Sequence, residues 1–158
     1  ADSTPDFGAP RLAGGAVPAE RLRIGIAHDQ AFGFYYSEDL DSLRAANVEL
    51  IDIDTLHAQT LPEVDGLIIG GGFPEMFMTE LEANVPLRSQ ICTAIETGLP
   101  TYAECGGLMY LSKSLSWQGQ TRQMVGVVPG DTVMHARPVG RGYARLPPTG
   151  RRRPRSGA

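Results

Sequence analysis

Short apolar runs of strand length alternate with stretches of helical spacing from Arg23 onward. The runs with strand character lie at residues 24–27, 48–53, 64–69 and 100–103, with a fifth candidate at 125–128. Helical spacing follows at residues 37–47, 86–97 and 108–115. Strands separated by helices of this length predict βαβ units, and therefore an α/β fold whose mostly parallel sheet has helices on both faces.

Composition narrows the class of protein. The 158 residues, 42% of them apolar, suit one globular domain, and a formal net charge of −4 argues against nucleic-acid binding. No apolar run reaches the ~18–20 residues that a membrane span needs. The two cysteines, Cys92 and Cys105, cannot form a disulfide framework, and no His or Cys cluster indicates a metal site. We therefore expect a cytoplasmic protein without a metal ion and without a nucleic-acid or membrane partner.

The two ends of the chain differ in composition from its middle. Residues 1–21 are rich in Ala, Gly and Pro without periodicity, which predicts a linker or leader. The end of the chain is basic, with an arginine run at 151–155. Such a run favours a solvated, disordered terminus over a phosphate-binding site.

Two loops of unusual composition follow the third and fourth predicted strands. They read GGGFPE at residues 70–75 and AECGG at residues 103–107. Because chemistry in parallel sheets is found at the carboxyl ends of the strands, these loops are the candidate site.

Cys105 is the candidate nucleophile. It stands where a strand turns into a helix, with Ala103 and Gly107 as small neighbours two positions away on either side. A nucleophile elbow requires small residues there, since larger side chains would block the turn. The alternative is a buried structural cysteine, which the flanking glycines disfavour. Cys92 falls within an amphipathic helix and is expected to pack against the core.

The glycine loop could supply hydrogen-bond donors to a reaction at Cys105. Backbone N–H groups of residues 70–72, together with that of Gly106, would stabilise the oxyanion formed when a thiolate attacks an amide. A phosphate cradle is the alternative, but the loop lacks the Lys-Ser/Thr of a P-loop and the spacing of a dinucleotide fingerprint.

A nucleophilic thiol also needs a base, which is normally histidine. The chain contains His28, His57 and His135, and none is placed by its sequence position as the partner of Cys105. For each, a polar loop or structural histidine is the alternative. Two glutamates, Glu75 and Glu104, flank the candidate site and could orient an amine, although solvated loop acids are an equal alternative. An aromatic cluster follows the first strand and is expected to pack in the core or at an interface; it consists of Phe32, Phe34, Tyr35 and Tyr36.

Four strings resemble the glutamine amidotransferase domain of the cobyrinic acid a,c-diamide synthase family. They are DQAFGFYY (29–36), LPEVDGLIIGGGFPE (61–75), GLPTYAECGGLMYLS (98–112) and MVGVVPGDTVMHARPVGRGYARL (124–146). The resemblance is specific because the four motifs occur in the family's order. It implies a domain at residues 22–146 with a flavodoxin-like, three-layer sandwich fold and class I, triad-type chemistry.

The resemblance also implies site residues and partners. Its nucleophile motif falls on Cys105, and its oxyanion loop falls on Gly71, Gly72 and Phe73. The family takes ammonia from glutamine and, as a C–N bond-forming ligase, uses it to amidate the a- and c-carboxylates of a corrinoid in cobalamin biosynthesis. ATP and Mg²⁺ would bind in a preceding domain, so none is expected in this chain. A second copy of the chain, in a homodimer, is a further candidate partner.

The sequence departs from the family pattern in two places. The ATP-binding domain is absent, and the segment resembling GHEFHYS that carries the family's catalytic histidine does not follow the GRGY string. Instead the chain leaves the pattern at residue 146, and residues 147–158 are expected to form a disordered basic tail. These departures predict a fold that is incomplete at its C-terminal end.

The departures leave three functional hypotheses. The first is the glutaminase domain of a corrinoid a,c-diamide synthase. The second is an inactive domain with a binding or structural role, because a nucleophile and its base act as one unit. The third, which the corrinoid-type strings disfavour, is a peptidase-like or stress-response member of the same superfamily.

Overall fold

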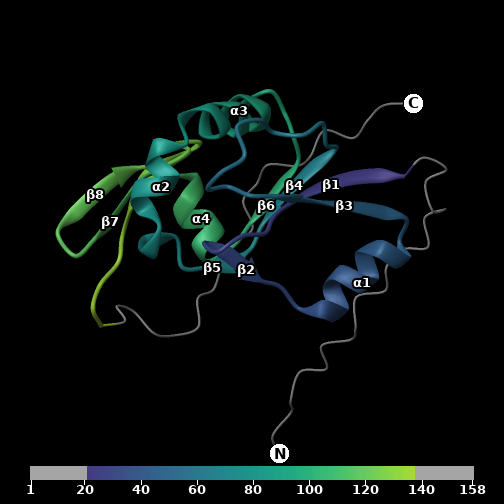
Figure 1. Cartoon of the computed structure of the whole chain (residues 1–158), viewed down its shortest axis with the longest axis horizontal. Helices are drawn as coiled ribbons and strands as arrows, with labels where there is room; N and C mark the ends of the chain where they lie inside the picture. Colours follow the sequence, from purple (N-terminus) through teal and green to yellow (C-terminus); the bar gives the residue numbers. More distant parts are fainter. Residues whose placement is uncertain (1–20, 138–158) are drawn as a thin grey trace, which may run out of the picture.

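The computed structural model describes residues 21–137 (Figure 1). The predicted tail at 147–158, and the predicted linker at 1–21 except for Arg21, lie outside the described residues. Within the described part, no helix is both long and apolar enough to cross a membrane.

A four-stranded parallel sheet forms the centre of the molecule. Its spatial order is β3-β1-β4-β6, which is the order expected of a flavodoxin-like sheet, so the predicted fold class is confirmed. Ile26 lies beside Ile68 of β4, which in turn lies beside Tyr102 of β6. The strands are β1 (Leu22–Ala27), β3 (Val48–Ile53), β4 (Gly66–Ile69) and β6 (Thr101–Ala103).

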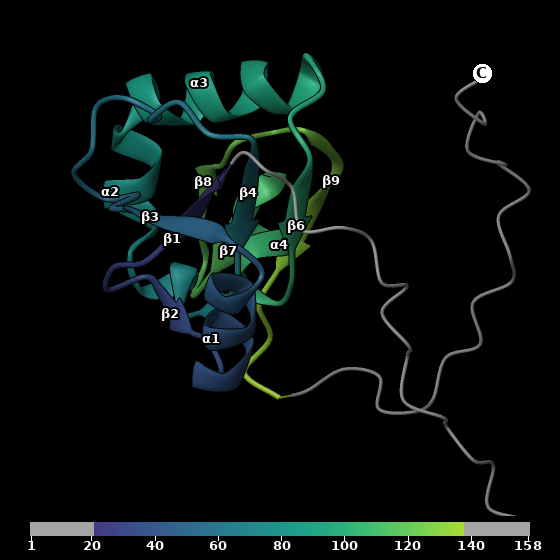
Figure 2. The ribbon, with the colours of Figure 1, turned by 90° about the vertical axis from the view of Figure 1, so that its right-hand side faces the viewer.

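Helices lie on both sides of this sheet. Helix α3 and helix α1 are on opposite sides in both views of the ribbon (Figures 1 and 2). The core lies on the α3 side, where Leu87 and Ile91 of α3 belong to one buried cluster with Leu67 and Ile69. No residue of α1 is buried. The helices are α1 (Ser37–Ala45), α2 (Met78–Ala83), α3 (Val85–Glu96) and α4 (Gly106–Leu111), with a 3-10 turn η1 (Pro74–Met76) before α2.

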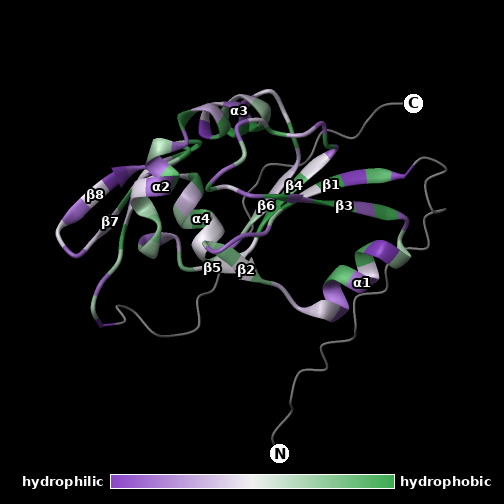
Figure 3. Cartoon of the chain, in the orientation of Figure 1, coloured by the Kyte–Doolittle hydropathy of each residue, from purple (hydrophilic) through white to green (hydrophobic). Residues whose placement is uncertain are grey.

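A second sheet, of order β8-β7-β9, follows α4. A two-residue turn at Gln118 and Gly119, both with positive φ, joins β7 to β8 as an antiparallel hairpin. Polar residues line β8 (Figure 3). The strands are β7 (Ser112–Trp117), β8 (Gln120–Gln123) and β9 (Val128–Val133).

This second sheet corrects two predictions. The helix expected at residues 108–115 ends at Leu111, and Leu115 lies in β7. Helix-like spacing of leucines is compatible with a strand when the strand's partners, here β8 and β9, come from later in the chain. The fifth strand begins at Val128 and not at Val125, because Gly126 has a φ of 89° that interrupts extended backbone.

A short antiparallel pair of strands completes the fold at the carboxyl edge of the central sheet. Strand β2 (Phe32–Phe34) pairs with β5 (Gly71–Gly72) of the glycine loop. Neither strand was expected from the sequence. The pair fixes the glycine loop against the segment that follows β1, next to the end of β6.

Candidate active site

Cys105 occupies a sharp turn between β6 and α4. Its φ of 49° and ψ of −116° lie in a region that non-glycine residues rarely adopt, and its side chain is exposed. Strained backbone of this kind persists only where the surrounding structure imposes it, and it is concentrated at functional sites. The backbone thus has the geometry of the elbow that the small neighbours of Cys105 predict.

The glycines after Cys105 let α4 begin directly on the sheet. A Cβ on Gly107 would collide with the carbonyl group of Ile69 at the end of β4. A Cβ on Gly106 would lie 2.9 Å from Cδ of Pro74 and 3.1 Å from the backbone nitrogen of Gly72. The Cys105 turn and the glycine loop are therefore in direct contact.

The predicted oxyanion donors differ in their availability. The Phe73 N–H already donates to the carbonyl oxygen of Ala31 at 2.9 Å, and Gly71 and Gly72 are part of the β2–β5 pair. The Gly106 N–H, at the start of α4, donates to none of residues 21–137. Because Gly106 directly follows Cys105, its N–H is available to an anion formed at that residue.

The three histidines lie on the surface. His28 Nδ1 is 3.4 Å from Oδ1 of Asp52, and His57 Nδ1 is 2.8 Å from Oδ2 of Asp54. His135 is exposed after β9. Within residues 21–137, no hydrogen bond joins any of them to the Cys105 thiol, so the described part of the chain assembles no cysteine–histidine pair.

Cys92 differs from Cys105 in its surroundings. It lies in α3, half-buried against the core cluster, as the sequence predicts. Burial raises the pKa of the Cys92 thiol, and the nearby carboxylate of Glu96 raises it further. Because the thiolate is the reactive form, Cys92 is disfavoured as a nucleophile at neutral pH.

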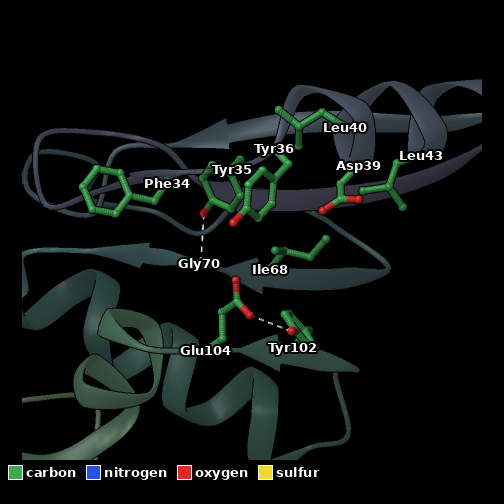
Figure 4. Close-up of a pocket in the computed structure, with 10 residues that line it drawn as sticks. All are labelled: Phe34, Tyr35, Tyr36, Asp39, Leu40, Leu43, Ile68, Gly70, Tyr102 and Glu104. Atoms are coloured by element: carbon green, nitrogen blue, oxygen red, sulfur yellow. Dashed lines mark hydrogen bonds between the residues drawn. The ribbon is translucent and has the colours of Figure 1, made fainter. Parts of the chain in front are cut away.

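A pocket of about 270 Å³ separates α1 from the carboxyl ends of β4 and β6 (Figure 4). Glu104 lines it and accepts a hydrogen bond of 2.8 Å from the hydroxyl of Tyr102. That hydrogen bond raises the pKa of Tyr102. Glu75 lies apart from this pocket, half-buried in η1.

The aromatic cluster predicted at residues 32–36 is divided among different environments. Phe32 is fully buried, with its ring centroid 5.4 Å from that of Tyr110, which agrees with a core role. Phe34 is exposed and meets Phe73 edge to face at 5.1 Å. Tyr35 is half-buried and Tyr36 is exposed.

Sequence reasoning missed two polar residues that contact the glycine loop or its supports. Asp29 accepts hydrogen bonds from the backbone N–H groups of Ala31 and Phe32, and Tyr35 accepts one from Gly70. For Asp29 a signal existed, since aspartate commonly closes a turn onto the N–H groups that follow it. For Tyr35 the partner lies 35 residues away, and no local pattern indicates it.

Two features of residues 21–137 bear on where ATP and Mg²⁺ would bind. No three His, Cys, Asp or Glu side chains within residues 21–137 are grouped as a metal site. The glycine loop is held in the β2–β5 pair and does not form a free phosphate cradle.

Comparison with known protein families matches residues 23–155 to the CobB/CobQ-like glutamine amidotransferase domain. The match continues beyond residue 146, where the resemblance of the four strings ends.

Relatives of the chain carry a consistent name. A cobyrinate a,c-diamide synthase of Magnetococcus marinus is 48% identical over 143 residues, which cover 89% of this chain and 31% of the relative. Enzymes of the same name from Methanosarcina barkeri and Archaeoglobus fulgidus are 45% and 46% identical, over 73% and 78% of this chain. The chain spans 26% and 27% of those two proteins. It thus spans about a quarter to a third of the length of these relatives.

Proposed function

Because this chain belongs to the CobB/CobQ-like glutamine amidotransferase domain family, we propose that it releases ammonia from glutamine at Cys105. The ammonia would serve a cobyrinate a,c-diamide synthase, a ligase that amidates the a- and c-carboxylates of a corrinoid. Family membership favours this function over the peptidase-like alternative.

The proposed chemistry proceeds through a covalent intermediate. The Cys105 thiolate attacks the carbon of the glutamine side-chain amide, and the Gly106 N–H donates to the resulting oxyanion. The C–N bond then breaks, the nitrogen takes up a proton and leaves as ammonia, and a glutamyl thioester remains. Water hydrolyses the thioester to glutamate and restores the thiol.

One observation supports this proposal above the others. Cys105 stands on a turn with φ of 49°, and the N–H of the next residue donates to none of residues 21–137. An exposed thiol beside an available donor is the arrangement that attack on an amide requires.

The rest of the proposed reaction involves partners outside the described residues. The corrinoid would be activated with ATP and Mg²⁺ in the ATP-binding domain of the full synthase, and we assign neither to this chain. We place the reaction in the cytoplasm, where both cysteines would remain reduced. The homodimer stays a prediction.

A second candidate function is binding without turnover. It is favoured by the surface positions of His28 and His57, which pair with aspartates and not with Cys105. Such a domain would still hold glutamine or a partner domain but would lack the base that activates the thiol.

Glutamate release from glutamine tests the proposed function. We expect the chain to form glutamate, the Cys105→Ala variant to form none, and the Cys92→Ser variant to match the unaltered chain. Equal glutamate release from Cys105→Ala would overturn the proposal. Labelling of Cys105 by a glutamine analogue without any glutamate release would favour the binding function.

A further inference from the structure

The Tyr35 hydroxyl joins two strands of the central sheet at their carboxyl ends. It donates to the carbonyl oxygen of Ala27 at 2.6 Å. It also accepts from the N–H of Gly70 at 3.0 Å, and Figure 4 shows this second hydrogen bond. The paired residues of β1 and β4 end at Ile26 and Ile68, one and two residues earlier. The hydroxyl therefore connects the two strands beyond the last pair of the ladder.

The Tyr35 ring also packs on Gly70. A Cβ at Gly70 would lie 2.5 Å from Cε1 of this ring, so the ring occupies the space that any other residue at position 70 would need. Burial raises the pKa of Tyr35, and the charge of Asp29 adds to this effect. The hydroxyl is consequently protonated at neutral pH and able to donate to Ala27.

Gly70 connects this contact to the Cys105 turn. While its N–H donates to Tyr35, its carbonyl oxygen accepts the N–H of Gly107 at 3.0 Å. Gly107 is the second residue of α4, directly after the candidate donor Gly106. The N–H and the carbonyl group of Gly70 thus connect the Tyr35 hydroxyl to Gly107, in the first turn of α4 directly after the Cys105 turn.

The other end of the glycine loop is held from the same segment of chain. Oδ1 of Asp29 accepts the N–H groups of Ala31 and Phe32 at 2.7 and 3.0 Å, and Oδ2 accepts the N–H and hydroxyl of Thr55 at 2.6 and 2.7 Å. This turn directs the Ala31 carbonyl oxygen toward the N–H of Phe73 at 2.9 Å. Residues 29–35 therefore hold the loop at Gly70 and at Phe73.

We propose that Tyr35 is a positioning residue for the reaction at Cys105, whose hydroxyl fixes Gly70 and thereby the placement of the glycine loop against Gly106. The inference rests on the proposed function. Donors stabilise an oxyanion most when they are fixed before the reaction, because reorienting them during the reaction would cost part of the free energy that they contribute. Loss of the hydroxyl should consequently weaken oxyanion stabilisation while leaving the thiol itself accessible.

The test compares two reagents on the same thiol. A chloroketone analogue of glutamine is attacked at its carbonyl carbon, which creates an oxyanion before chloride leaves and a thioether forms. Iodoacetamide alkylates a thiolate by direct displacement of iodide, with no oxyanion. The ratio of the two labelling rates at Cys105, measured by mass spectrometry, therefore reports on oxyanion stabilisation.

The variants are Tyr35→Phe and, as a matched control, Tyr36→Phe, which removes an exposed hydroxyl from the neighbouring position. We expect Tyr35→Phe to lower the chloroketone rate about 10-fold, since small displacements in a site have effects of this size or larger. The iodoacetamide rate should stay within about twofold, and Tyr36→Phe should leave both rates unchanged. Asp29→Asn, which replaces one of the two accepting oxygens at the other end of the loop with an NH2 donor, should lower the same ratio and provides a second test if Tyr35→Phe does not fold.

Two outcomes would contradict the inference. An unchanged ratio in a folded Tyr35→Phe variant would overturn it, whether both rates stay the same or fall equally. If the unaltered chain reacts with the glutamine analogue no faster than with chloroacetone, the proposed function itself fails and the role of Tyr35 fails with it.

Discussion

Tyr110 has the largest of the fully buried side chains within residues 21–137. Its ring packs on Phe32, but its hydroxyl has no hydrogen-bond partner among those residues. Burial raises the pKa of Tyr110 far above its ordinary value, with the charge of Arg88 acting in the opposite direction. The ring stabilises the core through apolar contact, whereas the hydroxyl is desolvated without compensation.

Tyr110→Phe should therefore stabilise the protein by about 1 kcal/mol, because it removes an unpaired buried hydroxyl and keeps the ring. The effect should grow with pH. A tyrosine whose pKa is raised in the folded state favours folding fully below its unfolded pKa of about 10 and loses that contribution as the pH rises toward the folded value. Urea unfolding at pH 7 and pH 10.5 measures both effects. A destabilised variant at pH 7 would indicate a partner for the hydroxyl.

At the scale of single residues, local pattern predicted the sharp turn at Cys105 but not the residues that support it. The turn at Cys105 follows from the small side chains around it, which are adjacent in sequence and therefore visible. The hydrogen bonds of Asp29 to Thr55 and of Tyr35 to Gly70 span 26 and 35 residues. No local sequence pattern indicates which distant residue a polar side chain will contact, so only the structure identifies these hydrogen bonds.

At the scale of elements, α4 is positioned by the glycines in its first turn. Its N-terminus crosses the end of β4 so closely that the carbonyl group of Ile69 occupies the space of a Cβ at Gly107. Backbone cannot give way as the end of a flexible side chain can. The contact between α4 and β4 thus depends on this single position.

Gly107→Ala should destabilise the protein by about 3 kcal/mol, at the upper end of what overpacking costs in a well-packed core. Gly130→Ala is the matched control, because a Cβ at Gly130 in β9 meets no atom within 4 Å. That control should change the free energy of unfolding by no more than about 0.5 kcal/mol. Urea denaturation of both variants measures the difference, and equal effects would show that α4 can shift away from β4.

The predictability of the elements follows the range of the interactions that form them. Helix α3 was expected between Pro86 and Gly98 and is found at Val85–Glu96, because its start and stop signals are local. Strand β7 was expected to be helical, since its pairing with β8 and β9 is decided by residues that come later. Strands β2 and β5 are too short to show any periodicity. The sheet order agreed with the fold class because parallel βαβ units permit few alternatives.

At the scale of the whole molecule, the two larger sheets share one core. Leu115 in β7 and Met124, directly after β8, belong to the same buried cluster as Ile69 of the central sheet. The N–H of Val125 also donates to the carbonyl oxygen of Tyr110 in α4. A common core of this kind should make the described part of the chain unfold as one cooperative unit.

Arg88 connects α3 to α2 and to the segment that follows β8, and its removal tests the coupling of the two sheets. From α3, it donates to the carbonyl oxygens of Met124 at 2.8 Å and Glu82 at 2.7 Å. Arg88→Met keeps most of the apolar stem and loses both bonds, which should cost about 2 kcal/mol because hydrogen bonds from charged groups exceed neutral ones. Arg88→Lys is the control, retaining the charge but only one donor group.

Hydrogen exchange followed by mass spectrometry should show residues 112–133 losing protection before β1 and β4 in Arg88→Met, and to a smaller degree in Arg88→Lys. Equal loss of protection in both sheets would mean that the apolar core alone couples them. Arg88 would then contribute to overall stability but not to the coupling of the two sheets.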